Sequence, residues 1–337
     1  MELGILMPPL PGRAINLARL AESLGFATLL FPDSQNMAPE VWGQLMLAAT
    51  ATTKIRLGPG VSNSVTRDPA VTASAALALQ VQSGGRALCG IGRGDSSVQR
   101  IGKQPDRLAN FERYLASLQI YLSGGTVDRD GFASRIEWLR AVNVPKVPVE
   151  VAATGVRVIE VAARHADRIA FAVGADIEHL AGAIEIARNA ARAARRDPAA
   201  LRFGAFVNCV VHADRAVARD AARGAVATFA RFSAFAGSKL ARLPLPLQNA
   251  ARFLREHYDM RHHTEASAEH ARALEDTFID WYAITGPPEI AIARFKQLAA
   301  LNLDFCHIVP GSANIPRDVA LASIRSLASD VLPALAG

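Results

Sequence analysis

The sequence predicts one (β/α)8 barrel, a TIM barrel, that spans residues 1–337 as a single domain. Three observations lead to this fold class. Short strand-like apolar runs alternate with Ala-rich amphipathic stretches, the alternation repeats eight times, and no G-x-G-x-x-G segment follows the first strand. The alternation favours parallel strands, because a crossover joins neighbouring strands in that orientation. Eight units fit closure into a barrel, and the missing glycine motif weakens the alternative, a doubly wound open sheet.

The eight predicted strands are short apolar runs bounded by glycine, proline or polar residues. They cover Leu3–Met7, Ala27–Phe31, Ile55–Pro59, Arg86–Ile91, Val147–Ala152, Arg168–Ala172, Phe203–Val211 and Phe305–Val309. The helices that follow them have helical apolar spacing, and some end at glycines such as Gly25 and Gly84. They cover Ala14–Leu24, Val41–Thr53, Ala70–Ser83, Leu108–Leu122, Val156–Ala166, Ile177–Arg195, Arg215–Phe232 and Asp318–Leu332, and a further helix, Pro288–Leu301, precedes the last strand.

Two insertions interrupt the repeat. Gly124–Asn143 carries turn residues and Trp138, whereas Ala234–Asp276 has the pattern of a helix, a proline-bounded turn and a second helix. Long insertions in barrels lie in loops, often over the active face. We therefore expect helical insertions there, and we expect the second one to cover the active face.

Composition limits the function classes. Half of the residues are hydrophobic, but no apolar run approaches the ~20 residues that a membrane helix needs. The first residues have the character of a core strand and lack the basic start of a signal peptide, so a cytoplasmic enzyme is expected. The net charge of +6 invites nucleic-acid binding, but the arginines are scattered over helices with acidic residues between them, as in Ile184–Arg196. Neither a nucleic-acid nor a membrane partner is predicted.

Cysteines and histidines give no metal prediction. Cys89, Cys209 and Cys306 lie far apart in apolar segments and have no CxxC partner, so they are expected to be buried. Four histidines of the second insertion lack metal-ligand spacing and are expected on a solvated surface: His257, His262, His263 and His270.

The residues directly after the strands are the expected site, because barrel enzymes react at the carboxyl ends of their strands. Thr154-Gly155 opens a predicted helix, where small residues expose N–H groups and the helix dipole favours an anion. Val173-Gly174 opens the neighbouring unit in the same way, so two adjacent loops form a candidate phosphate clamp. The alternative is a plain N-cap by Thr154. The glycine-rich segment GIGRGDSS is not a P-loop, because it lacks the GK[ST] ending.

Taken together, these segments resemble the bacterial-luciferase-like monooxygenase superfamily. The closer resemblance is to its branch that uses 8-hydroxy-5-deazaflavin, coenzyme F420. The segments that carry it are LGPGVSNSVTRDPAVTASAALAL, SGGRALCGIGRGDSS, VPVEVAATGVRVIEVAARHAD, TGPPEIAIARFKQL and HIVPGS. They cover nearly the whole chain except the two insertions, and their order is more specific than any single motif.

The resemblance implies a cofactor site. It implies a non-prolyl cis peptide at Gly60–Val61, in a bulge after the third strand that supports the cofactor ring, and a cofactor tail along the fifth and sixth units. An ordinary glycine turn is the alternative. The cofactor-binding residues implied in this way are Ser34, Gly60, Val61, Ser62, Asn63, Gly94, Ala153, Thr154, Gly155, Val173 and Gly174.

The resemblance also implies acidic catalytic residues. Asp95 matches a position facing the substrate, and Asp33 matches one at the end of the second strand; either carboxylate could instead cap a turn. The sequence departs from the branch at two places. Ser34 stands where the sugar-phosphate dehydrogenases have histidine, and Leu6 and Met7 stand where the methylene-tetrahydropterin reductases have an acid, so neither substrate is carried over.

The expected activity is hydride transfer between coenzyme F420 and an organic substrate. Three other functions remain open: an FMN-dependent monooxygenase on the same barrel, a non-catalytic flavin-binding relative, and a metal-dependent lyase or hydrolase. The family resemblance also implies a homodimer. Aromatic candidates for the pocket wall, for which core packing is the favoured role, are Trp42, Trp138, Trp281 and Tyr282.

Overall fold

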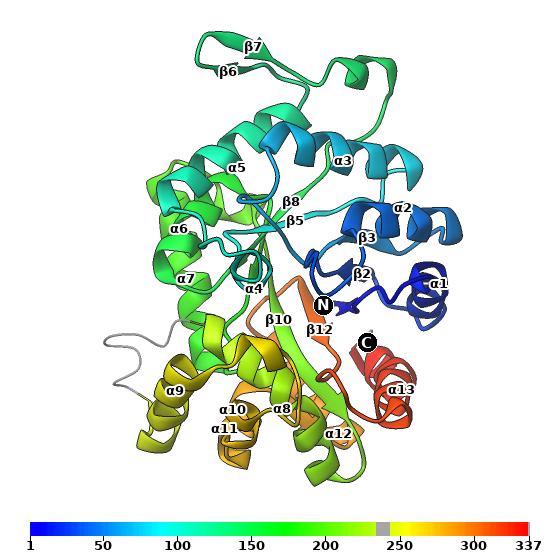
Figure 1. Ribbon diagram of the computed structural model, residues 1–337, viewed down its shortest axis with the longest axis vertical. Coiled ribbons are helices and arrows are strands. Elements are labelled where there is room, and N and C mark those ends of the chain that lie inside the picture. Colours follow the sequence, from blue (N-terminus) through cyan, green and yellow to red (C-terminus); the bar gives the residue numbers. More distant parts are fainter. Residues whose placement is uncertain (234–242, 336–337) are drawn as a thin grey trace.

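The computed structural model describes residues 1–233 and 243–335, and its central feature is a nearly closed barrel of parallel strands (Figure 1). The strand order is β3-β2-β1-β12-β10-β9-β8-β5-β4. These strands cover β1 Glu2–Leu6, β2 Thr28–Phe31, β3 Arg56–Pro59, β4 Ser62–Asn63, β5 Cys89–Gly92, β8 Val149–Ala153, β9 Arg168–Phe171, β10 Arg202–Val211 and β12 Phe305–Val309. All eight predicted strand positions are confirmed, and the predicted barrel with them.

The third strand is split, and the barrel closes at the split. β3 pairs with β2, whereas β4, which follows after two residues, pairs with β5. A parallel bridge between Leu57 and Ala87 joins β3 to the approach of β5, with a hydrogen bond of 2.8 Å from the Leu88 N–H to the Leu57 carbonyl. The Gly60–Val61 peptide bond between β3 and β4 is cis, as the resemblance implies.

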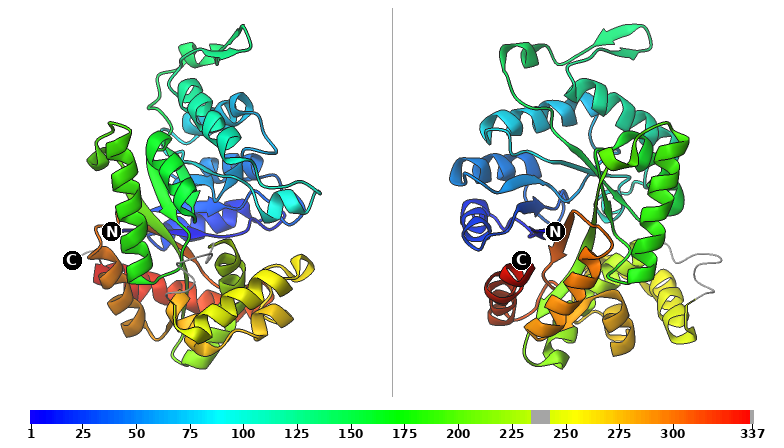
Figure 2. Two further views of the ribbon diagram at one scale, coloured as in Figure 1. Left: turned by 90° about the vertical axis from the view of Figure 1, so that its left-hand side faces the viewer. Right: turned by 180° about the vertical axis from the view of Figure 1, so that it is seen from behind.

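Helices surround the barrel on its outer side (Figures 1 and 2). They cover α1 Ala14–Ser23, α2 Val41–Ala51, α3 Pro69–Gln82, α5 Leu108–Leu122, α6 Val156–His165, α7 Ile177–Ala193, α12 Pro288–Ala299 and α13 Arg317–Ser326. After α13 come a π-helical turn, Leu327–Val331, and α14, Leu332–Leu335. The strands bury both faces. One face packs against this ring of helices, and the other packs inside the barrel around Leu30, Leu88 and Phe206.

One predicted unit is corrected. The sequence assigns the seventh barrel helix to Arg215–Phe232, which is α8. However, α8 belongs to a second apolar cluster with later helices, whereas Phe295 and Leu298 of α12 join the core between the barrel and its helices. The crossover that returns to β12 is therefore α12. The chain from α8 to the short strand β11, Ile284–Gly286, is an addition at the carboxyl end of β10, with which β11 pairs.

The first insertion is not helical. It forms an antiparallel hairpin, β6 Val127–Arg129 and β7 Phe132–Ser134, followed by a 3-10 turn, Glu137–Ala141. Because it connects α5 to the start of β8, it lies toward the amino ends of the strands. Figures 1 and 2 show the hairpin projecting from the opposite end of the molecule to α8 and α9.

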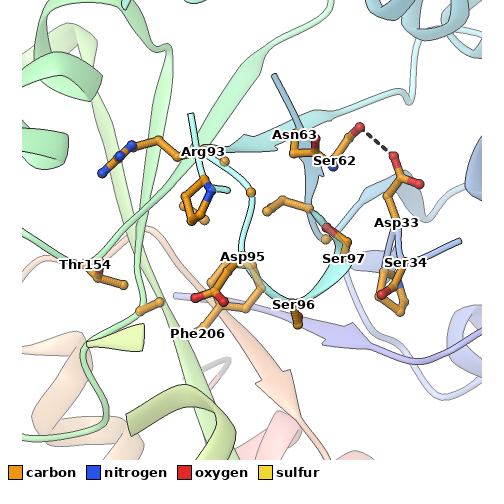
Figure 3. A pocket seen from close by; sticks show the side chains of 18 of the residues that line it. Asp33, Ser34, Ser62, Asn63, Arg93, Asp95, Ser96, Ser97, Thr154 and Phe206 are labelled. Atoms are coloured by element: carbon orange, nitrogen blue, oxygen red, sulfur yellow. Dashed lines mark hydrogen bonds between the residues drawn. The ribbon is translucent and has the colours of Figure 1, made fainter. Parts of the chain in front are cut away.

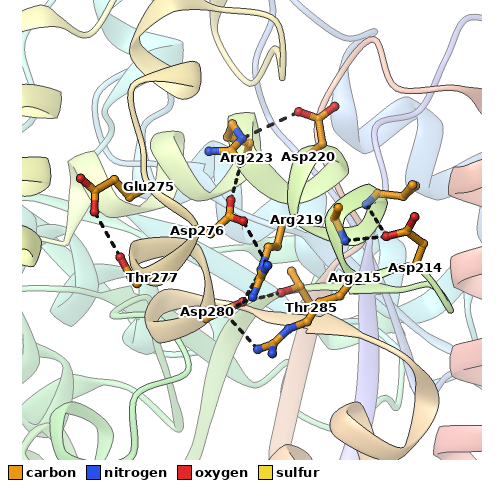
Figure 4. A network of polar contacts seen from close by, with 12 residues as sticks. Asp214, Arg215, Arg219, Asp220, Arg223, Glu275, Asp276, Thr277, Asp280 and Thr285 are labelled. Carbon is orange, nitrogen blue, oxygen red and sulfur yellow. Dashed lines mark hydrogen bonds and ion pairs between the residues drawn. The ribbon is translucent and has the colours of Figure 1, made fainter.

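The described part of the second insertion is helical. Its residues 234–242 lie outside the described residues. It contains α9 Leu245–His257, α10 Glu269–Arg272 and α11 Asp276–Tyr282. An ion-pair network fixes α8 to α11 (Figure 4). Arg219 contacts both Asp276 and Asp280, at 3.0 and 2.5 Å, and Arg223 contacts Asp276 at 2.9 Å.

Two further features concern the described residues alone. None of their helices combines the length and the apolar character needed to cross a membrane. The three cysteines are free and buried, as predicted, and burial raises the pKa of the Cys89 thiol to about 12.

Candidate active site

A cavity of about 420 Å³ opens at the carboxyl ends of the strands (Figure 3). Its wall draws on the segments after β2, between β3 and β4, and after β5, β8 and β9, together with β10 and α8. The residues that line it are Pro32, Asp33, Ser34, Gly60, Val61, Ser62, Asn63, Gly92, Arg93, Gly94, Asp95, Ser96, Ser97, Pro105, Ala152, Thr154, Gly155, Val158, Ala172, Phe206 and Phe229. The barrel thus brings residues separated by up to about two hundred positions, from Pro32 to Phe229, into one site.

All but three of the predicted site residues line this cavity. Ala153 is the first that does not, and the reason is the period of two in a strand. Glu150 and Ala152 of β8 point into the barrel, so Val151 and Ala153 point outward and pack in the core beneath the helices. The lining residue of this strand end is Ala152, with Thr154 beyond it.

Val173 and Gly174 are the other two. Val173 packs outward in the same core as Ala153. Gly174 has a φ of +83°, and a Cβ added there would lie 2.8 Å from the Tyr282 ring of α11. The neighbouring Ala175 N–H donates to the Tyr282 carbonyl at 2.8 Å. The second half of the predicted phosphate clamp is therefore covered by the insertion.

Thr154 and Gly155 form an open helix start. Gly155, not Thr154, is the N-cap residue of α6, and no side chain among the described residues caps this end. A Cβ added to Gly155 would meet no described heavy atom within 4 Å, so space lies directly beside the first amides. The alternative of a side-chain cap by Thr154 is wrong. Unsatisfied N–H groups and the positive end of the helix dipole make this position suited to an anion.

Asp33 is a buried carboxyl group on the opposite wall. Its Oδ2 accepts a hydrogen bond of 2.6 Å from the Ser62 hydroxyl, and Arg67 Nε lies 3.5 Å from the same oxygen. Burial raises the pKa of Asp33, and the contacts with Ser62 and Arg67 oppose that rise. Asp33 is therefore poised to exchange a proton closer to neutral pH than an ordinary aspartate.

Asp95 lies on the loop after β5, and Figure 3 shows it between Thr154 and the Ser62 side of the cavity. Its Oδ1 lies 2.6 Å from an Arg231 guanidinium nitrogen and accepts a hydrogen bond of 3.0 Å from Gln99 Nε2. Burial raises the pKa of Asp95, and the Arg231 charge lowers it. A half-buried carboxyl group of this kind is able to accept or donate a proton.

Unpartnered polar atoms test whether the cavity suits a heterocyclic cofactor. Asn63 Oδ1 accepts from the Val65 and Thr66 N–H groups, which leaves its Nδ2 without a partner among the described residues. Ser34 Oγ, on the same wall, is also buried and has no described partner. Such groups are costly unless something completes them. Ser34 Oγ and Asn63 Nδ2 could bind polar atoms of a heterocyclic ring, and the amides at the start of α6 could bind a phosphate of the same cofactor.

A buried polar triad lies beneath the cavity. Glu150 Oε2 accepts a hydrogen bond of 2.8 Å from Arg168 Nε, and its Oε1 lies 2.8 Å from His307 Nε2. Glu150 and His307 are 0% exposed and Arg168 is 4% exposed. The His307 ring lies 5.3 Å from that of Phe206, which lines the cavity floor. The triad therefore supports the floor from inside the barrel.

A family model described as luciferase-like monooxygenase matches residues 5–304. The chain belongs to this family. It is a luciferase-like enzyme, as the resemblance implies.

Individual relatives of this luciferase-like protein are reductases and dehydrogenases. A 5,10-methylenetetrahydromethanopterin reductase of Archaeoglobus fulgidus is 29% identical over 324 residues, 94% of each protein. The structure of coenzyme F420 dependent tetrahydromethanopterin reductase from Methanopyrus kandleri has a TM-score of 0.76 at 21% identity, over 98% of both chains. That of an F420-dependent secondary alcohol dehydrogenase with an F420-acetone adduct has a TM-score of 0.75 at 18% identity, over 99% of this chain and 98% of that one. Both structures have the luciferase-like barrel.

Several residues that line the luciferase-like site or contact its lining were not predicted. Phe206 and Phe229 form an apolar wall, Arg93 lines the cavity, and Arg231 reaches Asp95. Phe206 lies inside a predicted strand, where the alternation allows half of the positions to face inward. No sequence pattern indicated the role of Arg231, because its partner Asp95 lies 136 residues earlier in the chain.

Two predictions about the second insertion need correction. His263 and His270 are buried rather than solvated, because both pack against Tyr258. His257 and His262 are exposed. Among the described residues, no group of three or more His, Cys, Asp or Glu side chains is arranged to hold a metal ion.

The aromatic candidates divide in a similar way. Trp42 and Tyr282 are buried in separate apolar clusters, and Trp281 packs against the cluster that contains Tyr282. Core packing, the favoured role, is therefore confirmed for these three residues. Trp138 lies exposed in the turn after the hairpin, and it belongs neither to the core nor to the cavity wall.

Proposed function

We propose that this luciferase-like chain transfers a hydride between coenzyme F420 and an organic substrate. One observation carries the proposal. A single cavity joins the helix start at Gly155 to a wall that carries the buried atoms Ser34 Oγ and Asn63 Nδ2. No side chain in the described part of the chain caps that helix start, and neither atom has a hydrogen-bond partner there. The Archaeoglobus fulgidus reductase and the two F420-dependent enzymes that share the fold support this assignment.

The chain would supply binding and position. The amides at the start of α6 would hold the phosphate, and the segment from Gly60 to Asn63 would lie along the ring, with Ser34 and Gly94 beside it. When bound, the coenzyme supplies the two-electron chemistry. The apolar side chains of Phe206 and Phe229 would exclude water from the remaining space.

The proton that accompanies the hydride would be handled by a carboxyl group. Asp95 is the candidate, because it lines the cavity and has a neighbouring cation that keeps it available as a carboxylate. Asp33 would hold the opposite wall through Ser62, and its buried position suits it to exchange a proton with a polar group of the ring. The helical insertion would cover the loop that carries Asp95, since Arg100 of that loop donates to the Met260 carbonyl.

Gly155→Asp should weaken coenzyme binding. The new carboxylate would lie against the phosphate and the helix start, and we expect a loss of about 1–3 kcal/mol in binding free energy. The measurement is a titration with coenzyme F420 followed by absorbance. Gly182→Asp is the matched control, since an added Cβ at that helical glycine also meets no described atom and the residue does not line the cavity. Equal affinity of the two variants would move the phosphate site away from α6.

The chain should also form a homodimer through α2 and α3. These neighbouring outer helices contain no charged residue, although the outer face of a surface helix is normally polar. Leu47 and Val81 are 46% and 41% exposed on them. A second copy of the same face would cover these side chains.

Light scattering tests the dimer. The expected mass is twice the chain mass of 35.9 kDa, and Leu47→Glu should shift it toward one chain. Ile120→Glu is the control, because Ile120 is similarly exposed on α5. A single-chain mass for the unchanged protein, or the same loss of dimer in both variants, would contradict this interface.

A further inference from the structure

Arg231, in the last turn of α8, forms an ion pair with Asp95, the carboxylate to which the proposed function assigns the proton. The ion pair between Arg231 and Asp95 links α8 to the loop after β5, and the side chains are 15% and 32% exposed. We propose that Arg231 is a positioning residue that holds the Asp95 carboxylate at the cavity wall and makes its placement depend on the insertion. This inference rests on the proposed function, because it assigns Arg231 to the same site.

The insertion orients Arg231 from behind. Its guanidinium carbon lies 4.7 Å from the centre of the Tyr258 ring, in a cation–π arrangement. The Tyr258 hydroxyl is held 2.8 Å from Thr228 Oγ1 and 2.6 Å from His263 Nδ1. Burial raises the pKa of Tyr258 and lowers that of His263 to about 3, so both groups are neutral in this arrangement at ordinary pH. The charge that faces Asp95 is therefore that of Arg231.

The loop that carries Asp95 is closed at its base and attached at its tip. The Asp106 N–H donates to the Arg93 carbonyl at 2.9 Å, and Arg93 Nε donates to the Asp106 carbonyl at 2.8 Å. At the far side, Arg100 donates to the Met260 carbonyl at 2.5 Å. The loop of residues 93–106 is therefore attached twice, to α8 through a charge pair and to the insertion through a main-chain carbonyl.

The helix that carries Arg231 is held firmly. Arg219 and Arg223 of the same helix pair with Asp276 and Asp280 of α11 (Figure 4). A movement of α11 would thus carry α8 and Arg231 with it. Since Asp95 lines the cavity and Arg231 does not, Arg231 acts on a bound substrate through Asp95.

Arg231→Met tests the inference, because it keeps an apolar stem beside Tyr258 and removes the charge. In the protein without coenzyme, carboxyl NMR should show the titration of Asp95 moved to higher pH, since an opposing charge is lost. The groups that face this site are Arg231 of α8, Tyr258 and His263 of the insertion, and Arg100 of the loop. Hydrogen exchange of loop amides 94–102 should also become faster.

Two further variants keep the test decisive. Arg231→Lys should restore most of the wild-type titration. Arg100→Met should speed amide exchange in the loop but leave the Asp95 titration in place, since it removes the other attachment. If the Asp95 titration is the same in wild type and Arg231→Met, the inference is overturned.

Turnover gives the second readout. Arg231→Met should lower kcat between about tenfold and 100-fold through misplacement of the carboxylate. In an Asp95→Asn background the same change should have little added effect, because both act through one group. If the two substitutions lowered kcat by the product of their separate factors, the inference would be overturned.

Failure of the wild-type protein to bind coenzyme F420 would instead overturn the proposed function. The Asp95 titration distinguishes the two failures because it needs no coenzyme.

Discussion

Glu150→Gln should lower the free energy of unfolding by about 3–5 kcal/mol, because it removes one partner of a buried ion pair and leaves the others charged or unpaired. Glu150 is fully buried, and it is the acceptor for both Arg168 and His307 inside the barrel. Arg168 is almost fully buried and lies 3.9 Å from the centre of the Phe305 ring, so water cannot replace the lost carboxylate without opening the core. Urea unfolding followed by circular dichroism measures the loss.

The matched control is Glu185→Gln, on the exposed face of α7, which should change stability by less than about 0.5 kcal/mol. Equal stabilities of the two variants would contradict the role of the triad.

The dependence of the unfolding free energy on pH gives an independent check of the triad. Burial raises the pKa of Glu150, but the contacts with His307 and Arg168 together outweigh it and lower the pKa to about 2. Its stabilising contribution should be full above the unfolded-state pKa and should be lost as the pH falls from about 4.5 toward about 2.

Asp95→Asn should lower turnover by about 100-fold or more, because an amide can neither accept nor donate the proton that accompanies the hydride. Coenzyme affinity should stay within a few-fold, since the candidate phosphate and ring contacts lie at Gly155 and at the segment from Gly60 to Asn63. Steady-state kinetics with reduced and oxidised coenzyme, together with a binding titration, separate the two quantities.

A surface substitution of the same kind, Asp318→Asn at the start of α13, should leave turnover unchanged. Thermal unfolding of Asp95→Asn is needed as well, because the change leaves Arg231 without its carboxylate partner at residue 95. If turnover of a well-folded Asp95→Asn protein equals that of the unchanged protein, the proton must be handled by another group, and Asp33 would be the next candidate.

Much of the fold was predictable because each barrel unit is local. A strand run, a turn residue and an amphipathic helix stand next to one another in the chain, so their order alone leads to parallel pairing. The site followed from the same rule, since Asp33, Asn63, Asp95 and Gly155 each come at or just after a strand segment. The cis bond at Gly60–Val61 was available only from the family resemblance.

The rest depends on contacts between distant segments. In the strand VEVAA both faces are buried, so apolar composition alone does not decide whether Ala152 or Ala153 faces the cavity. The assignment of α12 rather than α8 as the seventh barrel helix depends on which apolar cluster each helix joins. The burial of His263 arises from packing within the insertion, and the reach of Arg231 to Asp95 arises from the packing of α8 against the loop after β5. Neither contact leaves a local sequence pattern.

A binding titration tests the central claim most directly. The purified protein, freed of bound cofactor, is titrated in parallel with coenzyme F420 and with FMN, and binding is followed by the absorbance change of each ring. We expect coenzyme F420 to saturate one site per chain and to bind at least about tenfold more tightly than FMN, a difference of about 1.4 kcal/mol. Tighter binding of FMN, or no binding of coenzyme F420 at any ratio, would contradict the account.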